Sequence, residues 1–391
     1  MSFAAAIFGL ALLVLIHEAG HFFAARAIGM TPRKFYIGFP PPVAKFQRGG
    51  VEYGFGAVPL GGYVKIPGMN RPTPGDLRRG IPPEVAAQNS AEIESIDNAL
   101  ESEDYTRAAE LVAQLQPAMG ETRAWQELEM AVAPDAYWRQ ATWRRLVAIG
   151  AGPAINLVFA VVLFAGIFVV SVSVATRTIG LVEKNTPAAK AGLHKKDVVI
   201  RIAGKPVGAK TLPKQIRATG GRPFKMVVLR HGKRVAIGPL RARMMDGHYR
   251  IGIAIEARDG PGESLPAASR DAVRLAWGIV SGTVSGLSHV VTGKDTNQIS
   301  SSVGIVRVSA AAWRQGLKDF LYAMGVISLA LGTLNLIPIL PLDGGHIVIA
   351  LVEKLRGRTF PQAVYVRYSA IGLGLFAVLM YLGLRNDLFR G

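Results

Sequence analysis

The sequence predicts a multi-pass α-helical membrane protein with four transmembrane helices, a membrane-associated β-hairpin and one β-rich domain. Half of its 391 residues are hydrophobic and only 18% are charged, which is typical of membrane proteins that also carry polar domains. Four apolar segments approach the roughly 20 residues that a helix needs to cross a bilayer. Short alternating strands after the second of these segments indicate the β-rich domain.

The first predicted transmembrane helix lies within residues 1–30 and contains the sequence His-Glu-Ala-Gly-His, which begins at His17. Two imidazoles four residues apart share one helix face, so His17 and His21 can hold one Zn²⁺, with Glu18 beside them to move protons. Ionisable groups inside a membrane are costly and mark functional sites, although two buried histidines can also simply pack a helix. A signal peptide is excluded for this segment, because it has no basic start and contains the metal motif.

The next segment, residues 31–71, is predicted to form the membrane-associated β-hairpin. The stretch Val51–Ile66 alternates aromatic and β-branched residues with glycines, a pattern that favours a hairpin. Glycines allow close approach of a backbone, so we expect this hairpin to lie near another part of the protein. An ordinary surface hairpin is the alternative.

Residues 72–134 are predicted to form an acidic, cytoplasmic helical insert. Positions 76–135 contain 13 acidic and 4 basic residues, and short helices are expected at 91–100 and 105–115. The whole chain nevertheless has a formal charge of +18, because basic residues gather later in the sequence. They are spread without interleaved aromatic residues or a recognition-helix pattern, so we expect no nucleic-acid partner. Attraction to the anionic headgroups of the lipid bilayer, or to an acidic partner, explains them more simply.

The rest of the chain alternates membrane helices with polar segments. Its predicted order is the second transmembrane helix at 135–175, the β-rich domain at 176–260, an external membrane-surface segment at 261–318, the third helix at 319–352, and a cytoplasmic loop with the fourth helix at 353–391. Lys and Arg residues flank the connection between the first two helices and fill the one between the last two. By the positive-inside rule these connections are cytoplasmic, which places both termini and the β-rich domain outside.

A catalytic zinc site needs a third protein ligand and an open position for water. The chain has no cysteine, so the ligand must be a carboxylate or another histidine. Asp343 is the strongest candidate, because it stands at membrane depth among prolines and glycines that interrupt the third helix. His346 is a competing ligand, and a kinked helix with a satisfied polar residue is the non-functional alternative.

These motifs resemble those of the site-2 proteases, zinc metalloproteases of the membrane, and in particular the bacterial branch with an external PDZ domain. The resemblance spans nearly the whole chain except the acidic insert. It rests on the His-Glu-Ala-Gly-His motif, on the run Asn335–Gly345, on Gly152–Asn156 in the second helix, and on Ile179–Val207, which is similar to a bacterial PDZ domain.

The resemblance implies roles for residues outside the zinc ligands. Asn335 would orient the substrate or stabilise developing charge. The glycine-rich hairpin would hold an extended substrate by strand addition, with contacts at Gly54, Phe55 and Gly56. The PDZ domain would either exclude intact substrates by size or bind a newly exposed C-terminal tail through Ile179, Gly180, Leu181 and Val182.

The function that we expect is zinc-dependent intramembrane endopeptidase activity in the bacterial plasma (inner) membrane. Zn²⁺ would be held by His17, His21 and Asp343, and Glu18 would take the proton of its water and pass it to the leaving amine. The resemblance implies pre-cut single-pass membrane proteins as substrates, such as anti-sigma factors and remnant signal peptides, in regulated intramembrane proteolysis. A catalytically silent PDZ membrane receptor and a metal transporter stay open as alternatives, although a transporter predicts several metal positions along a pathway.

Overall fold

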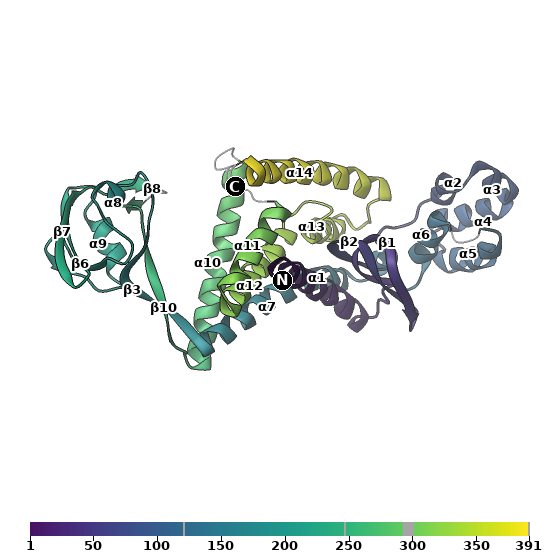
Figure 1. Cartoon of the computed structure of the whole chain (residues 1–391). Coiled ribbons are helices and arrows are strands. Elements are labelled where there is room, and N and C mark those ends of the chain that lie inside the picture. Colours follow the sequence, from purple (N-terminus) through teal and green to yellow (C-terminus); the bar gives the residue numbers. More distant parts are fainter. Residues whose placement is uncertain (120–121, 246–247, 292–300, 390–391) are drawn as a thin grey trace. The chain divides into compact units, whose positions relative to one another are not determined.

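The computed structural model describes residues 1–119, 122–245, 248–291 and 301–389, and it divides into two compact units (Figure 1). Unit 1 comprises Met1–Ala165 and Ser269–Gly391, and unit 2 comprises Gly166–Ala268. Unit 1 contains the long apolar helices, a small sheet and a helical bundle, whereas unit 2 is rich in strands.

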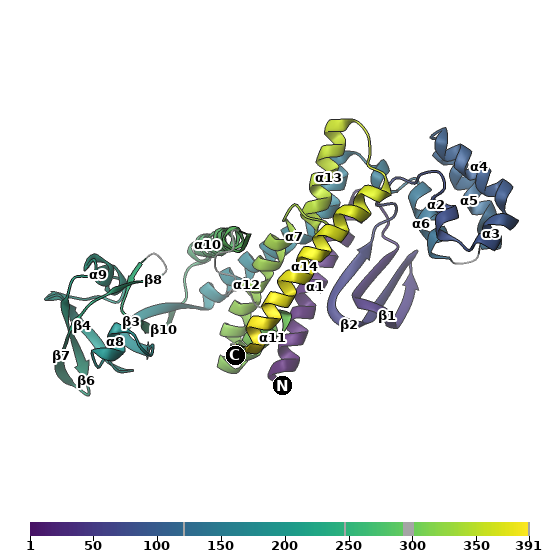
Figure 2. The same ribbon diagram turned by 90° about the horizontal axis from the view of Figure 1, so that it is seen from above.

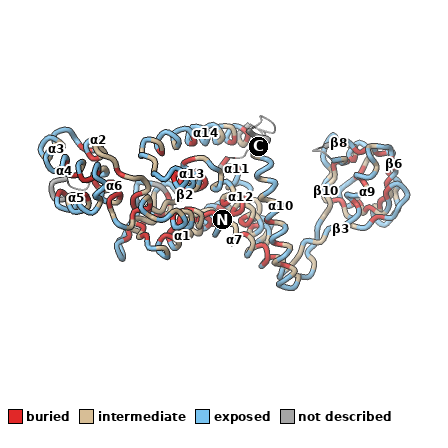
Figure 3. The backbone as a smooth tube through the Cα atoms, turned by 180° about the vertical axis from the view of Figure 1, so that it is seen from behind, coloured by how far each residue is buried: buried red, intermediate tan, exposed pale blue. Residues whose placement is uncertain are grey.

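Four of the described helices are long and apolar enough to cross a membrane, and the protein is therefore a membrane protein. They are α1 (Ser2–Ala27), α7 (Thr142–Val170), α12 (Leu317–Asn335) and α14 (Gln362–Phe389). Large apolar side chains such as Phe8, Val162 and Phe376 are exposed on them, which suits surfaces in contact with lipid. Figure 2 shows the axes of α1, α12 and α14 roughly parallel to one another, and Figure 3 shows that most of α14 is exposed.

The predicted third transmembrane helix, residues 319–352, is two helices. Helix α12 ends at Asn335, and α13 (Asp343–Arg356) begins after a connection that is not helical. That connection contains Pro338 and Pro341, which lack a backbone N–H and restrict the residue before them, so an α-helix cannot run through it. The aspartate of the predicted site therefore stands at the start of a separate helix.

The structure also gives the elements of the membrane-surface segment and the end of the second transmembrane helix. The membrane-surface segment expected at 261–318 contains α10 (Leu265–Val291) and α11 (Ser302–Gln315), and α11 packs against α1, α12 and α14. The second helix ends at Val170, five residues before the predicted end at 175, because strand β3 begins directly after it.

The small sheet of unit 1 is formed by β1 (Lys34–Arg48) and β2 (Val51–Lys65), joined by a turn at Gly49 and Gly50. The stretch 34–37 pairs with 52–55 on one side and with 62–65 on the other, while 44–48 pairs with 51–55. The prediction of a hairpin within Val51–Ile66 is therefore wrong, because its two halves pair with 34–37 from opposite sides and not with each other. The outer strands of this arrangement are 44–48 and 62–65, and 62–65 is the one beside Glu18 of α1.

The acidic insert is a bundle of short helices with an apolar core. Its helices are α2 (Asp76–Gly80), α3 (Pro83–Gln88), α4 (Ser90–Glu101), α5 (Tyr105–Met119) and α6 (Arg123–Val132). Ile93, Ile96 and Leu100 recur at helical spacing on α4 and are buried against Trp125 and Leu128 of α6. Helices α4 and α5 are the two that the sequence predicts at 91–100 and 105–115.

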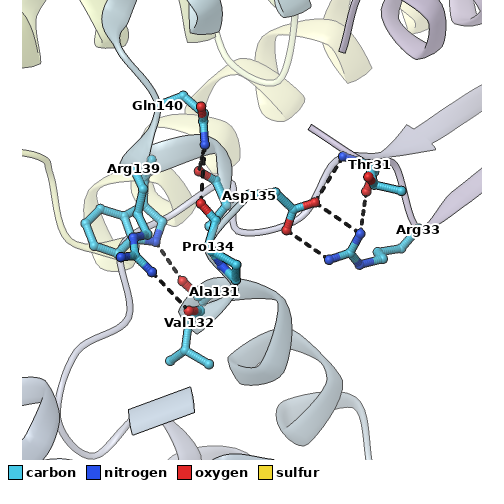
Figure 4. Close-up of polar contacts among 10 residues, drawn as sticks. Thr31, Arg33, Ala131, Val132, Pro134, Asp135, Arg139 and Gln140 are labelled. Carbon is cyan, nitrogen blue, oxygen red and sulfur yellow. Dashed lines mark hydrogen bonds and ion pairs between the residues drawn. The ribbon is translucent and has the colours of Figure 1, made fainter. Parts of the chain in front are cut away.

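Polar contacts fix the end of the insert to the start of the sheet (Figure 4). The Asp135 carboxylate accepts hydrogen bonds from the Thr31 backbone N–H at 3.0 Å and from the Arg33 guanidinium at 3.0 and 3.2 Å. The 3₁₀ helix η1 (Tyr137–Arg139) follows, and the Tyr137 N–H donates to the Pro67 carbonyl at 2.8 Å. The C-terminal end of the insert is thereby joined to the segments on both sides of the sheet.

Unit 2 contains a six-stranded antiparallel sheet with short helices, in which five strands form a continuous series. The strand order is β10 (Ile253–Pro261), β3 (Ser171–Val182), β4 (Val198–Ile202), β6 (Phe224–Arg230) and β7 (Lys233–Leu240). The smaller elements are α8 (Pro187–Lys190), β5 (Lys205–Pro206), α9 (Leu212–Ala218), β8 (Arg243–Met245) and β9 (His248–Arg250). Its core is apolar and includes Ile179, Val199 and Met226, each fully buried.

Candidate metal centre

Two helices bring together three possible metal ligands. His17 and His21 lie one turn apart on α1, and Asp343 is the first residue of α13. The Oδ2 atom of Asp343 lies 3.3 Å from Nε2 of His17 and 3.4 Å from Nε2 of His21, and the two Nε2 atoms are 3.3 Å apart. Among the residues that the structure describes, these three form the one group of three or more histidine or acidic side chains whose ligand atoms converge in this way.

The spacing of these atoms suits a zinc ion. A tetrahedral zinc with bonds of about 2.0–2.1 Å to nitrogen or oxygen separates its ligand atoms by about 3.3–3.4 Å. The three measured separations agree with that edge length. In addition, Oδ2 of Asp343 is buried and has no hydrogen-bond partner of good geometry in the described structure, as expected of an atom whose partner is a cation.

Helix α7 orients both histidines. Nδ1 of His21 lies 2.9 Å from the Ala148 carbonyl oxygen, so that Nδ1 carries the proton and Nε2 is left to bind metal. Nδ1 of His17 lies 3.4 Å from Nδ2 of Asn156, a fully buried residue whose own backbone carbonyl accepts from Ser328 at 2.9 Å. The resemblance singled out the motif containing Asn156 without giving it this contact, and a backbone carbonyl such as that of Ala148 leaves no signal in a sequence.

Glycines are required where the two halves of the site approach each other. A Cβ atom at Gly152 of α7 would collide with the His21 ring. A Cβ atom at Gly344 would collide with the carbonyl groups of Leu336 and Ile337. These positions allow α7 to pack against His21 and let α13 begin close to the connection that precedes it.

Two of the predicted site residues have other surroundings. Asn335 is the last residue of α12, and its Nδ2 donates to the Leu331 carbonyl of the same helix at 3.1 Å. His346 is not part of the three-ligand group among the described residues, and its ring lies 6.1 Å from that of Tyr365. The geometry therefore favours Asp343 over His346 as the third ligand.

The outer strand of the small sheet lies beside Glu18. The Val64 backbone lies beside the Glu18 carboxylate, and a Cβ atom at Gly62 would stand 3.0 Å from Glu18 Cγ. The predicted contact residues Gly54, Phe55 and Gly56 belong instead to an inner strand, where Gly54 pairs with both Tyr36 and Lys45. The part of the hairpin that adjoins the metal ligands is thus 62–64.

The predicted tail-binding residues of unit 2 also lie in an inner strand. Ile179–Val182 belong to β3, between β10 and β4, and Ile179 donates its N–H to Asp197 and is fully buried. A cavity of about 450 Å³ lies elsewhere, between α9 and the start of β10, and is lined by apolar residues that include Leu212, Ile216 and Ile253. The lining of this cavity thus includes β10, which is a strand at the edge of the sheet, and does not include Ile179–Val182.

A buried ion pair joins α7, which orients the two histidines, to α13, which carries Asp343. Arg145 of α7 and Glu353 of α13 are each 4% exposed, and Nη2 of Arg145 lies 2.5 Å from Oε2 of Glu353. The other carboxylate oxygen accepts from the Phe360 N–H at 2.6 Å and the Tyr365 hydroxyl at 3.1 Å. The Arg145 guanidinium lies over the Tyr137 ring, 4.8 Å from its centre.

Comparison with known proteins agrees with this chemistry. Residues 5–379 match the family described as Peptidase family M50. A similar protein of Rhizobium meliloti is 28% identical over 98% of this chain and 95% of the relative. Relatives from Lactococcus lactis (26% identical, 98% of this chain and 97% of the relative) and Campylobacter jejuni (25%, 100% and 94%) are similar to it as well. All three have the words zinc metalloprotease in their names. Because the family match covers nearly its whole length, the chain belongs to peptidase family M50, the site-2 proteases, and is a zinc metalloprotease.

Proposed function

We propose that this metalloprotease cleaves the transmembrane segments of single-pass membrane proteins that have already been cut outside the membrane. The observation that carries the proposal is the position of the metal ligands. Two of them, His17 and His21, lie on α1, a helix long and apolar enough to cross a bilayer. A hydrolytic site on such a helix meets peptide bonds that lie within the membrane.

His17, His21 and Asp343 would hold the metal, and Glu18 would move the protons. A zinc ion held by these two imidazoles and one carboxylate would keep a position open for water, would lower the pKa of that water toward about 7 and would polarise the scissile carbonyl. Glu18 takes the proton of the attacking water and passes it to the leaving amine. The contact between His21 and Ala148 supports this assignment, because it leaves Nε2 unprotonated for the metal.

The substrate helix must unwind, since a helical peptide hides its carbonyl groups in hydrogen bonds. We propose that the unwound chain is held by strand addition to the outer strand 62–64. The contact of Val64 with Glu18 supports this, because a strand added there lies next to the proton-transferring group. Asn335 is proposed to orient the substrate or to stabilise developing charge, using the second N–H of its side-chain amide.

Unit 2 is proposed to be an external PDZ domain of a protein in the bacterial plasma membrane, with both chain termini outside. The cavity between α9 and β10 supports a role in binding a newly exposed C-terminal tail, and a size filter is the competing role. Anti-sigma factors and remnant signal peptides are the substrates proposed, in regulated intramembrane proteolysis. A catalytically silent receptor would use the same cavity, so catalysis itself must be tested.

The test compares the wild type with Glu18→Gln, each purified in detergent and supplied with a single-pass model substrate that lacks its external domain. We expect Glu18→Gln to keep about one zinc per chain and to lose about 10²- to 10⁴-fold in cleavage rate, because its amide cannot accept the proton. The control is Glu92→Gln, which alters an exposed glutamate of the insert and should cleave normally. Cleavage by Glu18→Gln at the wild-type rate would contradict the proposal.

A further inference from the structure

A cleft of about 600 Å³ lies between the small sheet and the acidic insert. On the sheet side it is lined by Tyr63, Val64, Lys65 and Ile66, which are the outer strand and its continuation. On the other side it is lined by residues of α2 and α6. Because Val64 also contacts Glu18, the cleft runs along the same strand that adjoins the metal ligands.

The backbone of this strand can accept another chain. In a strand, successive backbone groups point to opposite sides, and the side facing 34–37 is occupied by the pairing already described. The Lys65 carbonyl accepts from the Arg33 N–H at 2.7 Å on that inner side, whereas the Val64 backbone contacts Glu18 on the outer side. An extended peptide that pairs with Gly62–Val64 therefore continues into the cleft.

Among the residues that the structure describes, the cleft contains one cation that lacks a carboxylate partner. Its three arginines are each paired, Arg71 with Glu103 at 2.7 Å, Arg79 with Asp76 at 2.5 Å and Arg123 with Glu127 at 2.8 Å.

By contrast, no described carboxylate forms an ion pair with Lys65, whose side chain is only partly exposed. Burial lowers the pKa of Lys65, and the neighbouring Lys34 and Arg123 lower it further, against the opposing effect of Glu127. The environment of this ammonium group therefore favours the arrival of a negative charge.

A second group in the cleft lacks a partner. Asn70 lines it, and the Oδ1 atom of Asn70 is buried without a hydrogen-bond donor in the described part of the chain. A buried amide oxygen that accepts no hydrogen bond is costly. The backbone N–H of a bound peptide is a donor of the required kind, which an anionic lipid headgroup without N–H groups does not supply.

We propose that this cleft is a specificity subsite that receives the extended substrate chain beside the scissile bond and selects an acidic side chain there, with Lys65 as its partner. The inference rests on the proposed protease function and adds a preference in the substrate sequence. Lys65 is a specificity-determining residue in this view, and it takes no part in the bond-breaking step. The insert acts as the far wall of the cleft, held in place by the contacts of Asp135 with Thr31 and Arg33.

The experiment uses the full-length protein and a model transmembrane substrate in which one residue is varied. That residue is moved along the six positions on each side of the scissile bond, as Glu, Gln or Lys in turn. At one or more positions we expect the wild type to cleave the Glu substrate with a kcat/KM about 5- to 10-fold above that of the Lys substrate, as one partly buried ion pair provides. Lys65→Gln should remove that preference, and Lys65→Glu should reverse it.

The matched control is Lys45→Glu, which introduces the same charge change at an exposed lysine of the opposite outer strand and should leave the preference unchanged. Cleavage of the Gln substrates reports on the protease function itself, so failure of the subsite and failure of the protease give different results. The proposal is overturned if the wild type shows no preference for Glu at any position, or if Lys65→Gln and Lys65→Glu keep the wild-type preference while still cleaving the Gln substrates.

Discussion

Removing one partner of the buried pair between Arg145 and Glu353 should lower the free energy of unfolding strongly. Removing both partners should lower it by much less than the sum of the two single losses. Each side chain is 4% exposed, so either one, left alone, is a buried charge without compensation. Breaking such a pair costs about 3–5 kcal/mol. We therefore expect Arg145→Met and Glu353→Gln each to lower the free energy of unfolding by about 3 kcal/mol.

The double variant leaves no buried charge. The amide introduced by Glu353→Gln would still offer an oxygen to the Phe360 N–H or the Tyr365 hydroxyl, so we expect a total loss of only about 1–3 kcal/mol and a coupling energy of about 3 kcal/mol or more. The assay is reversible unfolding in mixed detergent micelles, followed by tryptophan fluorescence. Arg144→Met alters the exposed neighbouring arginine and should change stability by less than about 0.5 kcal/mol.

The same variants should weaken zinc binding, because the pair joins α7, which orients the histidines, to α13, which carries Asp343. The affinity is measured by competition with a chromogenic chelator at a temperature where all variants are folded. A single variant as stable as Arg144→Met, or losses of the two single variants that simply add in the double variant, would contradict this prediction.

Three further predictions concern single side chains. Gly152→Ala should lose zinc, because its Cβ atom would displace the second histidine of the motif. Gly150→Ala on the same helix has open space around its Cβ atom and should bind zinc normally. Elemental analysis of the two purified variants measures the difference in zinc content. Asn156→Ala should weaken zinc binding about 10- to 100-fold by freeing the first histidine ring, measured by chelator competition, and unchanged affinity would contradict this. Although burial opposes it, the bonds from Arg230 hold the pKa of Asp197 below its usual value. Asp197→Asn should therefore lower the free energy of unfolding by about 1–2 kcal/mol near pH 7. This loss should fade as the pH falls below about 4, which is the pKa of an aspartate in the unfolded chain. A loss that does not depend on pH would be inconsistent with this prediction.

The local part of the site is predictable from the sequence, because helix geometry alone places His17 and His21 on one face. The third ligand is more than 300 residues away, and its choice over His346 depends on how α13 packs, which local spacing does not determine. Zinc as the cofactor and the metalloprotease class, both expected from the motif, are confirmed by the family match.

Pairing between distant segments is what the sequence does not reveal. The alternation in Val51–Ile66 indicates strands, but it cannot reveal that 34–37 inserts between their two halves. In unit 2 the alternating residues near Ile179 identify a strand, while the edge position belongs to β10, about 75 residues later. The ion pair of Arg145 and Glu353 likewise joins residues 208 positions apart, so no local pattern announces it.

The zinc content and zinc coordination of the purified full-length protein are the decisive test of the proposed metal site. Elemental analysis of the wild type should give about one zinc per chain, and X-ray absorption should give bonds of about 2.0–2.1 Å to two imidazole nitrogens and to oxygen. Asp343→Ala should lose the metal or bind it far more weakly. A wild type without zinc after loading, or a zinc whose coordination is unchanged in Asp343→Ala, would contradict the assignment of His17, His21 and Asp343 as the ligands.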